Sequence, residues 1–242
     1  RQKNVIDSLE KRSEKESIKK HFKNFDDSYF NKNSSNSLKW QSGLILNNIK
    51  DDFIVGCKKK FDNLIEIFIK ADDSPGLFFK LAKILEHSGL EIIDANIFTS
   101  GNGIFAANTF IAKYSRHDRA LNKSELTELS SKIKKNFTKI DEIVKTKSAK
   151  RKNMRFEKII KINESINKDK NRNLITIETV DSPGLLVNIS KVFFEHKVSI
   201  HSARINTLGE RIEDTFEIEN FNKKLVPDYK IKKIVTQLRK VV

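Results

Sequence analysis

The segment Asp73-Ser74-Pro75-Gly76-Leu77 occurs a second time as Asp181-Ser182-Pro183-Gly184-Leu185, and this repeat decides the fold. The two copies stay in register over the residues that follow, where identical side chains recur as Lys83/Lys191, Ile92/Ile200, Ala95/Ala203, Ile97/Ile205 and Thr99/Thr207. A difference of two residues in a turn then shifts the register, and Thr109-Phe110 corresponds to Thr215-Phe216. Agreement of this extent indicates two structural modules of one kind in tandem.

Each copy predicts the same order of elements. A short apolar run rich in β-branched residues precedes each motif and is too short for a helix, so it is a predicted strand. The serine of the motif stands where an N-cap belongs, the proline fits the first helical position, and apolar residues then repeat at helical spacing. Alternating strands joined by a turn follow, and a second helix ends each copy. In the first copy the predicted strands after the motif cover 92–99 and 104–114, and the second helices of the two copies cover 123–137 and 228–241.

This order predicts an α+β fold, namely two ferredoxin-like βαββαβ modules in tandem, each with both helices on one face of a four-stranded antiparallel sheet. The fourth strand is the open point. Residues 156–162 supply a candidate for the first module, but the second copy ends at Val242 just after its second helix. We therefore divide the chain into a mainly helical connector (1–60), a first module with a basic linker (61–164) and a second module (172–242).

Charge and composition narrow the function classes. The net charge of +15 invites a nucleic-acid interpretation, but much of the excess gathers between 145 and 161, in the predicted linker. A single cysteine, Cys57, excludes a disulfide framework, and the sequence contains no apolar run long enough to span a membrane. We expect a cytoplasmic protein without a membrane anchor. Because the chain opens on Arg1 in a charged segment, we also expect it to be a fragment.

The repeated turn is the strongest candidate for a binding site. Its aspartate can meet an ammonium group, its proline fixes the turn, and its glycine lets a ligand approach the main chain. Free N–H groups at the start of the following helix attract a carboxylate. These features together suit an amino-acid zwitterion, although the same residue types are common in any turn from strand to helix.

A D-x-P-G-L turn followed by a helix and an A-x-I-x-T strand resembles the ACT domain, a regulatory module that binds amino acids where copies pair. The run Ala203 to Phe216, A-R-I-N-T-L-G-E-R-I-E-D-T-F, is similar to the tandem ACT region of the bifunctional uridylyltransferase/uridylyl-removing enzymes of nitrogen control. Asn108-Thr109-Phe110-Ile111 and the connector Lys150-Arg151-Lys152 carry the same resemblance. The resemblance covers 61–242, with a weaker link from an HD-type domain at 29–46.

The resemblance implies a regulatory region that senses glutamine, pairs ACT with ACT, and controls catalytic domains that add UMP to the PII protein and remove it. Those domains, which would use Mg²⁺, are not visible in this sequence, and we assign no catalytic residue, cofactor or metal site to the chain. The dipeptide His117-Asp118 is present without the further ligands that an HD metal site needs. Together, the turns and the resemblance give as candidate ligand-binding residues Asp73, Gly76, Leu77, Glu91, Ile92, Asp181, Gly184, Leu185, Ser199 and Ile200.

Two alternatives stay open. The first is the ACT region of another amino-acid-controlled enzyme. The second is a basic RNA-recognition protein, which shares the element order but stacks bases on aromatic residues of its central strands. The stretch 103–107 only partly matches the aromatic core of such a module, and the second copy places acids there, which argues against RNA binding. The residues alone leave open the ligand's side chain, whether the modules pair within or between chains, and how the signal reaches the catalytic domains.

Overall fold

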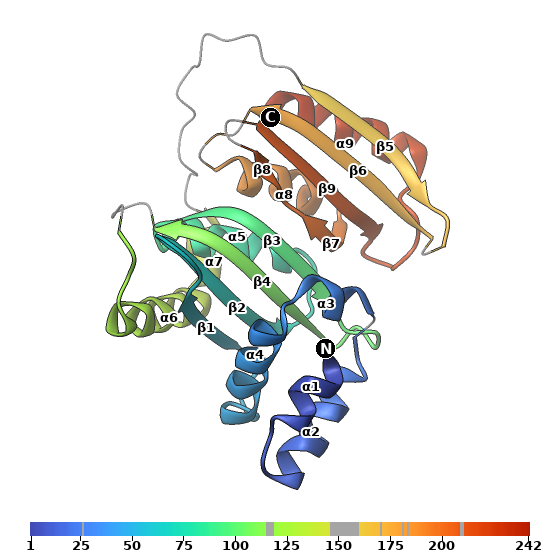
Figure 1. The fold of residues 1–242 in the computed structure, drawn as a ribbon. Coiled ribbons are helices and arrows are strands. Elements are labelled where there is room, and N and C mark those ends of the chain that lie inside the picture. Colours follow the sequence, from blue (N-terminus) through green and yellow to red (C-terminus); the bar gives the residue numbers. More distant parts are fainter. Residues whose placement is uncertain are drawn as a thin grey trace.

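The computed structural model describes residues 1–25, 27–114, 119–145, 160–169, 171–180, 182, 184–208 and 211–242. Its first part is helical and lies against the first module (Figure 1). Where the sequence suggests one helix from Val5 to Phe22, the chain breaks it between residues 8 and 11. The N-terminal helices are α1 (Gln2–Asp7), α2 (Arg12–Phe22), α3 (Asp27–Lys32) and α4 (Ser35–Asn47).

The two modules have the same order of elements. The first module consists of β1 (Ile54–Lys59), β2 (Leu64–Asp72), α5 (Leu77–His87), β3 (Leu90–Thr99), β4 (Phe105–Tyr114) and α6 (Lys123–Thr138), followed by α7 (Ile140–Lys145). The second consists of β5 (Lys161–Asn167), β6 (Arg172–Val180), α8 (Leu185–Glu195), β7 (Val198–Arg204), β8 (Thr207–Leu208), β9 (Arg211–Asn220) and α9 (Asp228–Val241). The α+β class and the two ferredoxin-like modules predicted from the repeat are confirmed.

The fourth strand of each module comes before the other three in the sequence. Strand β1 pairs antiparallel with β2, and β5 pairs antiparallel with β6. The candidate strand at 156–162 was therefore assigned to the wrong module, because the strand that begins at Lys161 pairs with β6 of the second module. The first module likewise begins before residue 61, since β1 lies in the segment assigned to the connector. A two-strand hairpin explains this arrangement, because it closes locally without a crossover.

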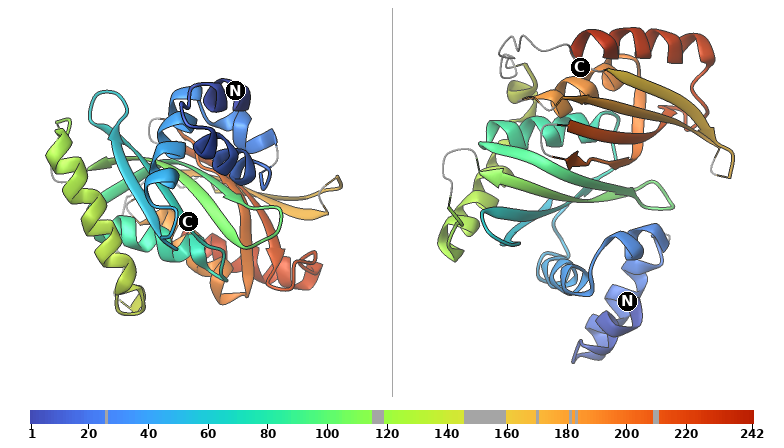
Figure 2. Two further views of the ribbon diagram at one scale, coloured as in Figure 1. Left: turned by 90° about the horizontal axis from the view of Figure 1, so that it is seen from below. Right: turned by 45° about the horizontal axis from the view of Figure 1, so that its top comes forward.

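The described strands form a single antiparallel sheet that runs through both modules in the order β1-β2-β4-β3-β7-β9-β6-β5, with β8 paired to β9. The modules join where β3 meets β7, at the pair Asn96 and Arg204. Helices α5 and α8 lie next to each other on one face of this sheet. The two views in Figure 2 show the continuous sheet and the N-terminal helices packed against the first module. The modules of this one chain therefore pair side by side.

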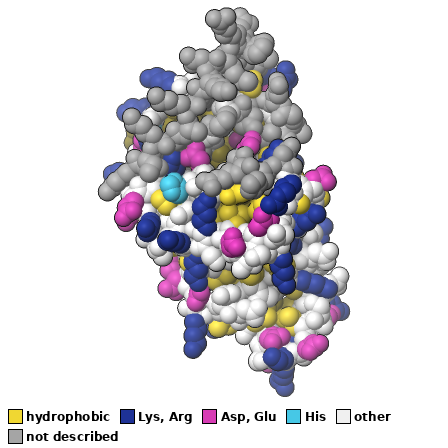
Figure 3. All heavy atoms as spheres, turned by 90° about the vertical axis from the view of Figure 1, so that its left-hand side faces the viewer, with side chains coloured by type: hydrophobic (Ala, Val, Ile, Leu, Met, Phe, Trp, Pro, Cys, Tyr) yellow, Lys and Arg dark blue, Asp and Glu magenta, His cyan; other side chains and the backbone are white. Residues whose placement is uncertain are grey.

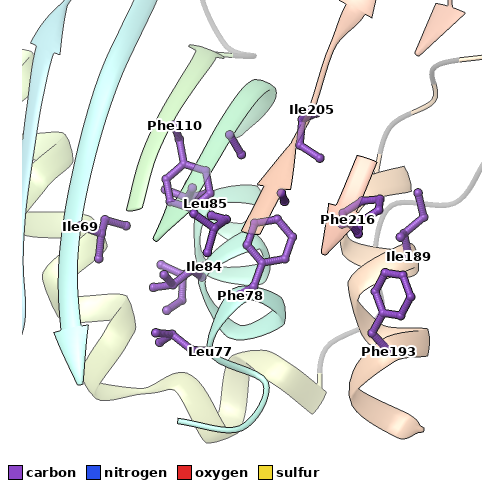
Figure 4. Packing of buried hydrophobic residues seen from close by; sticks show 14 of the residues in the cluster. Ile69, Leu77, Phe78, Ile84, Leu85, Phe110, Ile189, Phe193, Ile205 and Phe216 are labelled. Atoms are coloured by element: carbon purple, nitrogen blue, oxygen red, sulfur yellow. The ribbon is translucent and has the colours of Figure 1, made fainter. Parts of the chain in front are cut away.

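One hydrophobic core follows from that pairing, since the buried residues of both modules belong to a common cluster. In the first module Phe78 of α5 stacks on Phe110 of β4, with ring centroids 6.3 Å apart. In the second module Phe193 of α8 packs on Phe216 of β9 at 5.3 Å. Figure 4 shows these side chains between sheet and helices in each module. Burial of each such ring stabilises the fold by about 1.5–3 kcal/mol.

The other face of the first module's sheet is covered by the N-terminal helices. A second cluster joins these helices to the sheet residues Phe68, Phe98 and Ala107. A buried polar network also crosses this contact. Gln41 of α4 accepts a hydrogen bond from the Tyr29 hydroxyl (2.6 Å) and donates from Nε2 to Thr109 Oγ1 of β4 (3.2 Å). The segment before residue 54 is thus packed on the module rather than extended from it.

Candidate functional site

The D-S-P-G-L motif forms a tight turn between β2 and α5. The Leu77 N–H donates to the Ser74 carbonyl at 3.0 Å, and Gly76 adopts φ 75° and ψ 13°. Proline at the second and a positive-φ glycine at the third position are the requirements of a type II turn. The helix therefore begins at Leu77 with Gly76 as N-cap, and the prediction that Ser74 caps the helix and Pro75 opens it was wrong.

The second motif folds in the same way in its described residues. The Leu185 N–H donates to the Ser182 carbonyl at 3.0 Å, and Gly184 has φ 74° and ψ 6°. Asp181 and Pro183 lie outside the described residues. Identical turn geometry in two places follows from identical sequence, because only glycine takes this conformation at little cost.

The candidate residues fall into two pockets, each shared between the modules. The first pocket combines the first module's turn with the end of α8 and the start of β7. The second pocket combines the second module's turn with the end of α5 and the start of β3. Among the predicted residues, Asp73, Gly76, Leu77, Ser199 and Ile200 line the first pocket, and Gly184, Leu185, Glu91 and Ile92 line the second. Each turn therefore faces the strand start of the other module.

The first pocket is nearly filled by an aromatic ring. Its cavity volume is about 20 Å³, which is room for about one water molecule. A Cβ atom on Gly76 would lie 2.3 Å from Cδ2 of Phe194, so the ring of the second module lies directly on this glycine. Phe194 also stacks on Phe79 at 5.6 Å. The group that approaches the main chain at Gly76 is, in this structure, a side chain of the neighbouring module.

Asn108 of β4 lies in the same pocket and is 1% exposed. Neither its Nδ2 nor its Oδ1 has a hydrogen-bond partner. Its strand neighbours on either side are Ile69 and Ile97, which offer no polar side chain. A buried amide without partners costs free energy that most folded proteins avoid.

The second pocket is larger and more acidic, with a cavity volume of about 60 Å³. Asp214 of β9 is 2% exposed and accepts a hydrogen bond from the Asn206 N–H at 3.3 Å. Glu86 pairs with Lys83 at 2.8 Å through Oε2, while its buried Oε1 has no hydrogen-bond partner. Ser182 Oγ is also buried there without a hydrogen-bond partner. The two pockets are therefore alike in position and different in chemistry.

Asn108 and Asp214 were missed at the level of sequence, although the repeat contains the signal. Each stands just before the repeated Thr-Phe pair, at a strand position that faces the helices. A polar residue is unusual at a strand position that the alternation predicts to be buried, so it is a signal that the position has a role beyond packing. The repeat similarly aligns Phe194 with Glu86, which explains why one pocket is closed by a ring and the other holds a carboxylate.

The mouth of the first pocket adjoins an open cleft of about 450 Å³, and Asp73 and Thr99 border both. Arg172, His201 and Lys223 also line this cleft. Partial desolvation raises the pKa of Asp73 above its ordinary value, while Lys223 acts in the opposite direction. His201 therefore lies beside the mouth of the pocket rather than within it.

Other reactive residues do not assemble into a site in the part of the chain that the structure describes. Cys57 is half-buried, and desolvation raises the pKa of its thiol to about 12, which disfavours the reactive thiolate. Among the described residues no group of three His, Cys, Asp or Glu side chains is placed to hold a metal ion. His117, Asp118 and the cluster 150–152 lie outside these residues. No described helix is both long and apolar enough to cross a membrane.

The sheet surface also bears on the RNA alternative. An RNA-recognition module binds bases on the sheet face opposite its helices. In the first module α1 to α4 pack on that face, and in the second it carries Glu213, Glu217 and Glu219 of β9. Acids at this position repel phosphate. On the face drawn in Figure 3, basic side chains are interspersed with acidic ones. The covering helices in the first module and the acids in the second disfavour a nucleic-acid surface on this face of the sheet.

Two ferredoxin-like modules that share one sheet, with the turn of each facing the strand start of the other, are the arrangement that the resemblance to a tandem ACT region predicts. No family model matches the sequence. The chain is nevertheless homologous to part of the bifunctional uridylyltransferase/uridylyl-removing enzymes, and it is consistent with a C-terminal region of such an enzyme.

Many relatives carry that name, and three of them give the range of similarity. The enzyme of Psychrobacter sp. (strain PRwf-1) is 30% identical over 176 residues, 72% of this chain and 19% of the relative. That of Psychrobacter cryohalolentis is 28% identical over 175 residues, again 72% and 19%. That of Acinetobacter baumannii (strain AYE) is 26% identical over 229 residues, 92% of this chain and 26% of the relative. The chain thus spans about a fifth to a quarter of the length of these relatives.

Among solved structures, a crystal structure of aspartate kinase from Synechocystis aligns with 74% of this chain and 26% of its own, with a TM-score of 0.41 and 14% sequence identity.

Proposed function

We propose that this chain is the amino-acid-sensing regulatory region of a bifunctional uridylyltransferase/uridylyl-removing enzyme. The effector is glutamine, the substrate of the parent enzyme is the PII protein, and the region acts on catalytic domains elsewhere in that enzyme. The observation that carries the proposal is the reciprocal pair of pockets, in which each D-S-P-G-L turn faces the strand start of the other module.

The chemistry of these pockets supports an amino-acid effector. The start of α5 and of α8 offers backbone N–H groups, which suit the ligand's carboxylate. Asp73 stands at the mouth of the first pocket, where it suits the ligand's ammonium group. Because each pocket takes residues from both modules, a bound ligand contacts both at once. Occupancy therefore changes how the modules pack, which is the physical requirement for a regulatory signal.

A route for that signal exists in the first module. Asn108 faces the first pocket, and the next residue of β4, Thr109, accepts a hydrogen bond from Gln41 of the N-terminal segment. Adjacent residues of a strand point to opposite faces, so a shift of β4 on ligand binding changes the surroundings of Asn108 at the pocket and of Thr109 at the N-terminal segment. In a C-terminal region of the parent enzyme, this segment is the part nearest in sequence to the catalytic domains on which we propose the region acts.

Calorimetric titration of the 242-residue chain with glutamine and glutamate tests the proposal. We expect glutamine to bind and glutamate to bind at least about tenfold more weakly, a difference of about 1.4 kcal/mol. Gly76→Val and Gly184→Val each place a branched side chain at a turn glycine, and at least one must abolish binding. The proposal fails if glutamine gives no heat at millimolar concentration, or if both variants stay folded and bind as the wild type does.

A further inference from the structure

Asn108 is the starting point, because its burial has no structural explanation in its surroundings. Its neighbours on the helix-facing side of β4 are Ala106 and Phe110, both apolar and buried. Both polar atoms of its amide are buried without a partner. The equivalent residue of the second module, Asp214, accepts a hydrogen bond from the Asn206 N–H. A purely structural position would hold an apolar residue or a partnered one.

We propose that Asn108 is the specificity-determining residue of the first pocket, and that it recognises a ligand side chain ending in a primary carboxamide. The inference rests on the proposed function and assigns the glutamine-reading role to one pocket. An asparagine amide offers two N–H donors and a carbonyl acceptor, and a ligand carboxamide offers the complementary set. A carboxylate only accepts, so it leaves Oδ1 of Asn108 unpaired and buries a charge as well.

The pocket provides for the rest of an amino acid around Asn108. The turn at Gly76 brings the start of α5 to the same cavity, where its backbone N–H groups suit a carboxylate. Asp73 borders both the pocket and the open cleft of about 450 Å³, which gives a ligand a way in. The ligand then occupies the space between the turn of the first module and Ser199 of the second.

Phe194 must leave its present place for the ligand to enter. The cavity volume of about 20 Å³ is far too small for an amino acid, and the ring lies on Gly76. Phe194 is half-buried and comes from the last turn of α8, so its side chain can rotate towards solvent without unfolding the helix. When the ligand binds, the Phe194 ring of the second module leaves Gly76, and the polar ligand takes its place against the first module.

The second pocket does not suit the same ligand side chain. In place of Asn108 it has Asp214, and in place of Phe194 it has Glu86. Carboxylates at these positions accept from the NH₂ group of a ligand carboxamide but donate no hydrogen bond to its oxygen, so they satisfy only half of it. The two pockets, although related by the repeat, are therefore not equivalent.

The test compares Asn108 with its own counterpart. Calorimetry on the 242-residue chain uses glutamine, glutamate and methionine, whose side chain has a similar length but no amide. For the wild type we expect glutamine to bind at least about tenfold more tightly than methionine. Asn108→Ala lowers glutamine affinity about tenfold or more, leaves methionine nearly unchanged, and so removes the preference. The control Asn163→Ala, at an exposed asparagine of β5 that lines neither pocket, leaves glutamine affinity within about twofold, and Asp214→Asn at the second pocket distinguishes the two pockets.

A second variant keeps the test decisive if Asn108→Ala does not fold. Asn108→Leu preserves side-chain size, removes the unpartnered amide, and must lose glutamine binding while its thermal midpoint without ligand is unchanged or higher. If the wild type binds no amino acid, the proposed function itself fails. If the wild type binds glutamine and the Asn108 variants keep its preference, only the assignment to Asn108 is overturned. Loss of glutamine binding in Asp214→Asn but not in Asn108→Ala also overturns it, in favour of the second pocket.

Discussion

Replacement of Gly76 by alanine measures how much the packing of Phe194 on the turn contributes to stability. Two costs add in the folded state. At φ 75° an L-residue is strained by about 1–2 kcal/mol. The new Cβ also meets Cδ2 and Cε2 of Phe194 at 2.3 and 2.6 Å, and overpacking of this kind costs about 1–3 kcal/mol. We therefore expect Gly76→Ala to lower the free energy of unfolding by about 2–5 kcal/mol.

The two costs separate in a double-mutant cycle. In a Phe194→Ala background the ring is gone, so Gly76→Ala retains only the backbone strain of about 1–2 kcal/mol. The coupling between the two positions is then about 1–3 kcal/mol. Urea unfolding followed by circular dichroism measures each variant. Equal costs in both backgrounds would refute the reasoning, because they would show that Phe194 does not rest on Gly76.

Gly43 provides the matched control for this cycle. It lies within α4, and no atom comes within 4 Å of an added Cβ. Alanine is the better helix former, so Gly43→Ala raises the free energy of unfolding by about 0.5–1 kcal/mol. A lower free energy of unfolding for Gly76→Ala and a higher one for Gly43→Ala show that the effect at the turn does not come simply from adding a methyl group.

Three further predictions concern the N-terminal segment and the linker. Burial lowers the pKa of His21 from 6.5 to about 4, so the unfolded chain binds the proton more tightly than the folded chain does. The free energy of unfolding therefore falls by up to about 3 kcal/mol as the pH drops from about 6.5 towards 4. In urea unfolding, the His21→Phe variant lacks this part of the pH-dependent loss. Thr109→Val removes a partner of the buried Gln41 and costs about 1–3 kcal/mol in the same assay, whereas Thr215→Val, its counterpart outside that network, costs less than about 1 kcal/mol. Alanine at all of 150–152 changes glutamine affinity by less than about twofold in calorimetry, because we place this cluster in the linker; a tenfold loss, about 1.4 kcal/mol, contradicts that placement.

The repeat made most of the fold predictable. Because the D-S-P-G-L motif, the helical spacing after it and the alternating strands agree in both copies, the class and element order could be read from the sequence. The helix predicted at 228–241 is α9 at the same bounds, and that at 123–137 is α6 with one residue more. Local patterns suffice where propensity, capping and periodicity point the same way.

Two parts of the prediction were wrong: the module to which the edge strands belong, and the residue at which the first helix of a module begins. An edge strand such as β1 has a local pattern like any other, and only the completed sheet shows which neighbour it pairs with. Serine, proline and glycine in a row fit both a helix cap and a type II turn, and the positive φ of Gly76 decides between them.

The candidate site was predictable in part. The described turn residues and strand starts singled out from the sequence line the two pockets, and their role in binding stays a prediction. Their exchange between modules depends on the meeting of β3 and β7, which a single pair of residues marks. Asn108 was named for the resemblance but not as a binding residue, because the alternation of β4 gives it the position of a core residue and the sequence does not say whether a buried amide is partnered. Phe194 escaped notice because its contact with Gly76 spans the two modules.

The position of the edge strands has a consequence for dividing this protein. Strands β1 and β5 are the two outermost strands of the sheet. A chain begun at residue 61 loses β1, and β2, with Ile65, Ile67 and Ile69 all buried in the native sheet, then becomes a free edge. Long apolar edges recruit strands from other molecules. Such a fragment is expected to aggregate through β2, whereas a chain begun at residue 54 or earlier keeps this edge covered by its own hairpin.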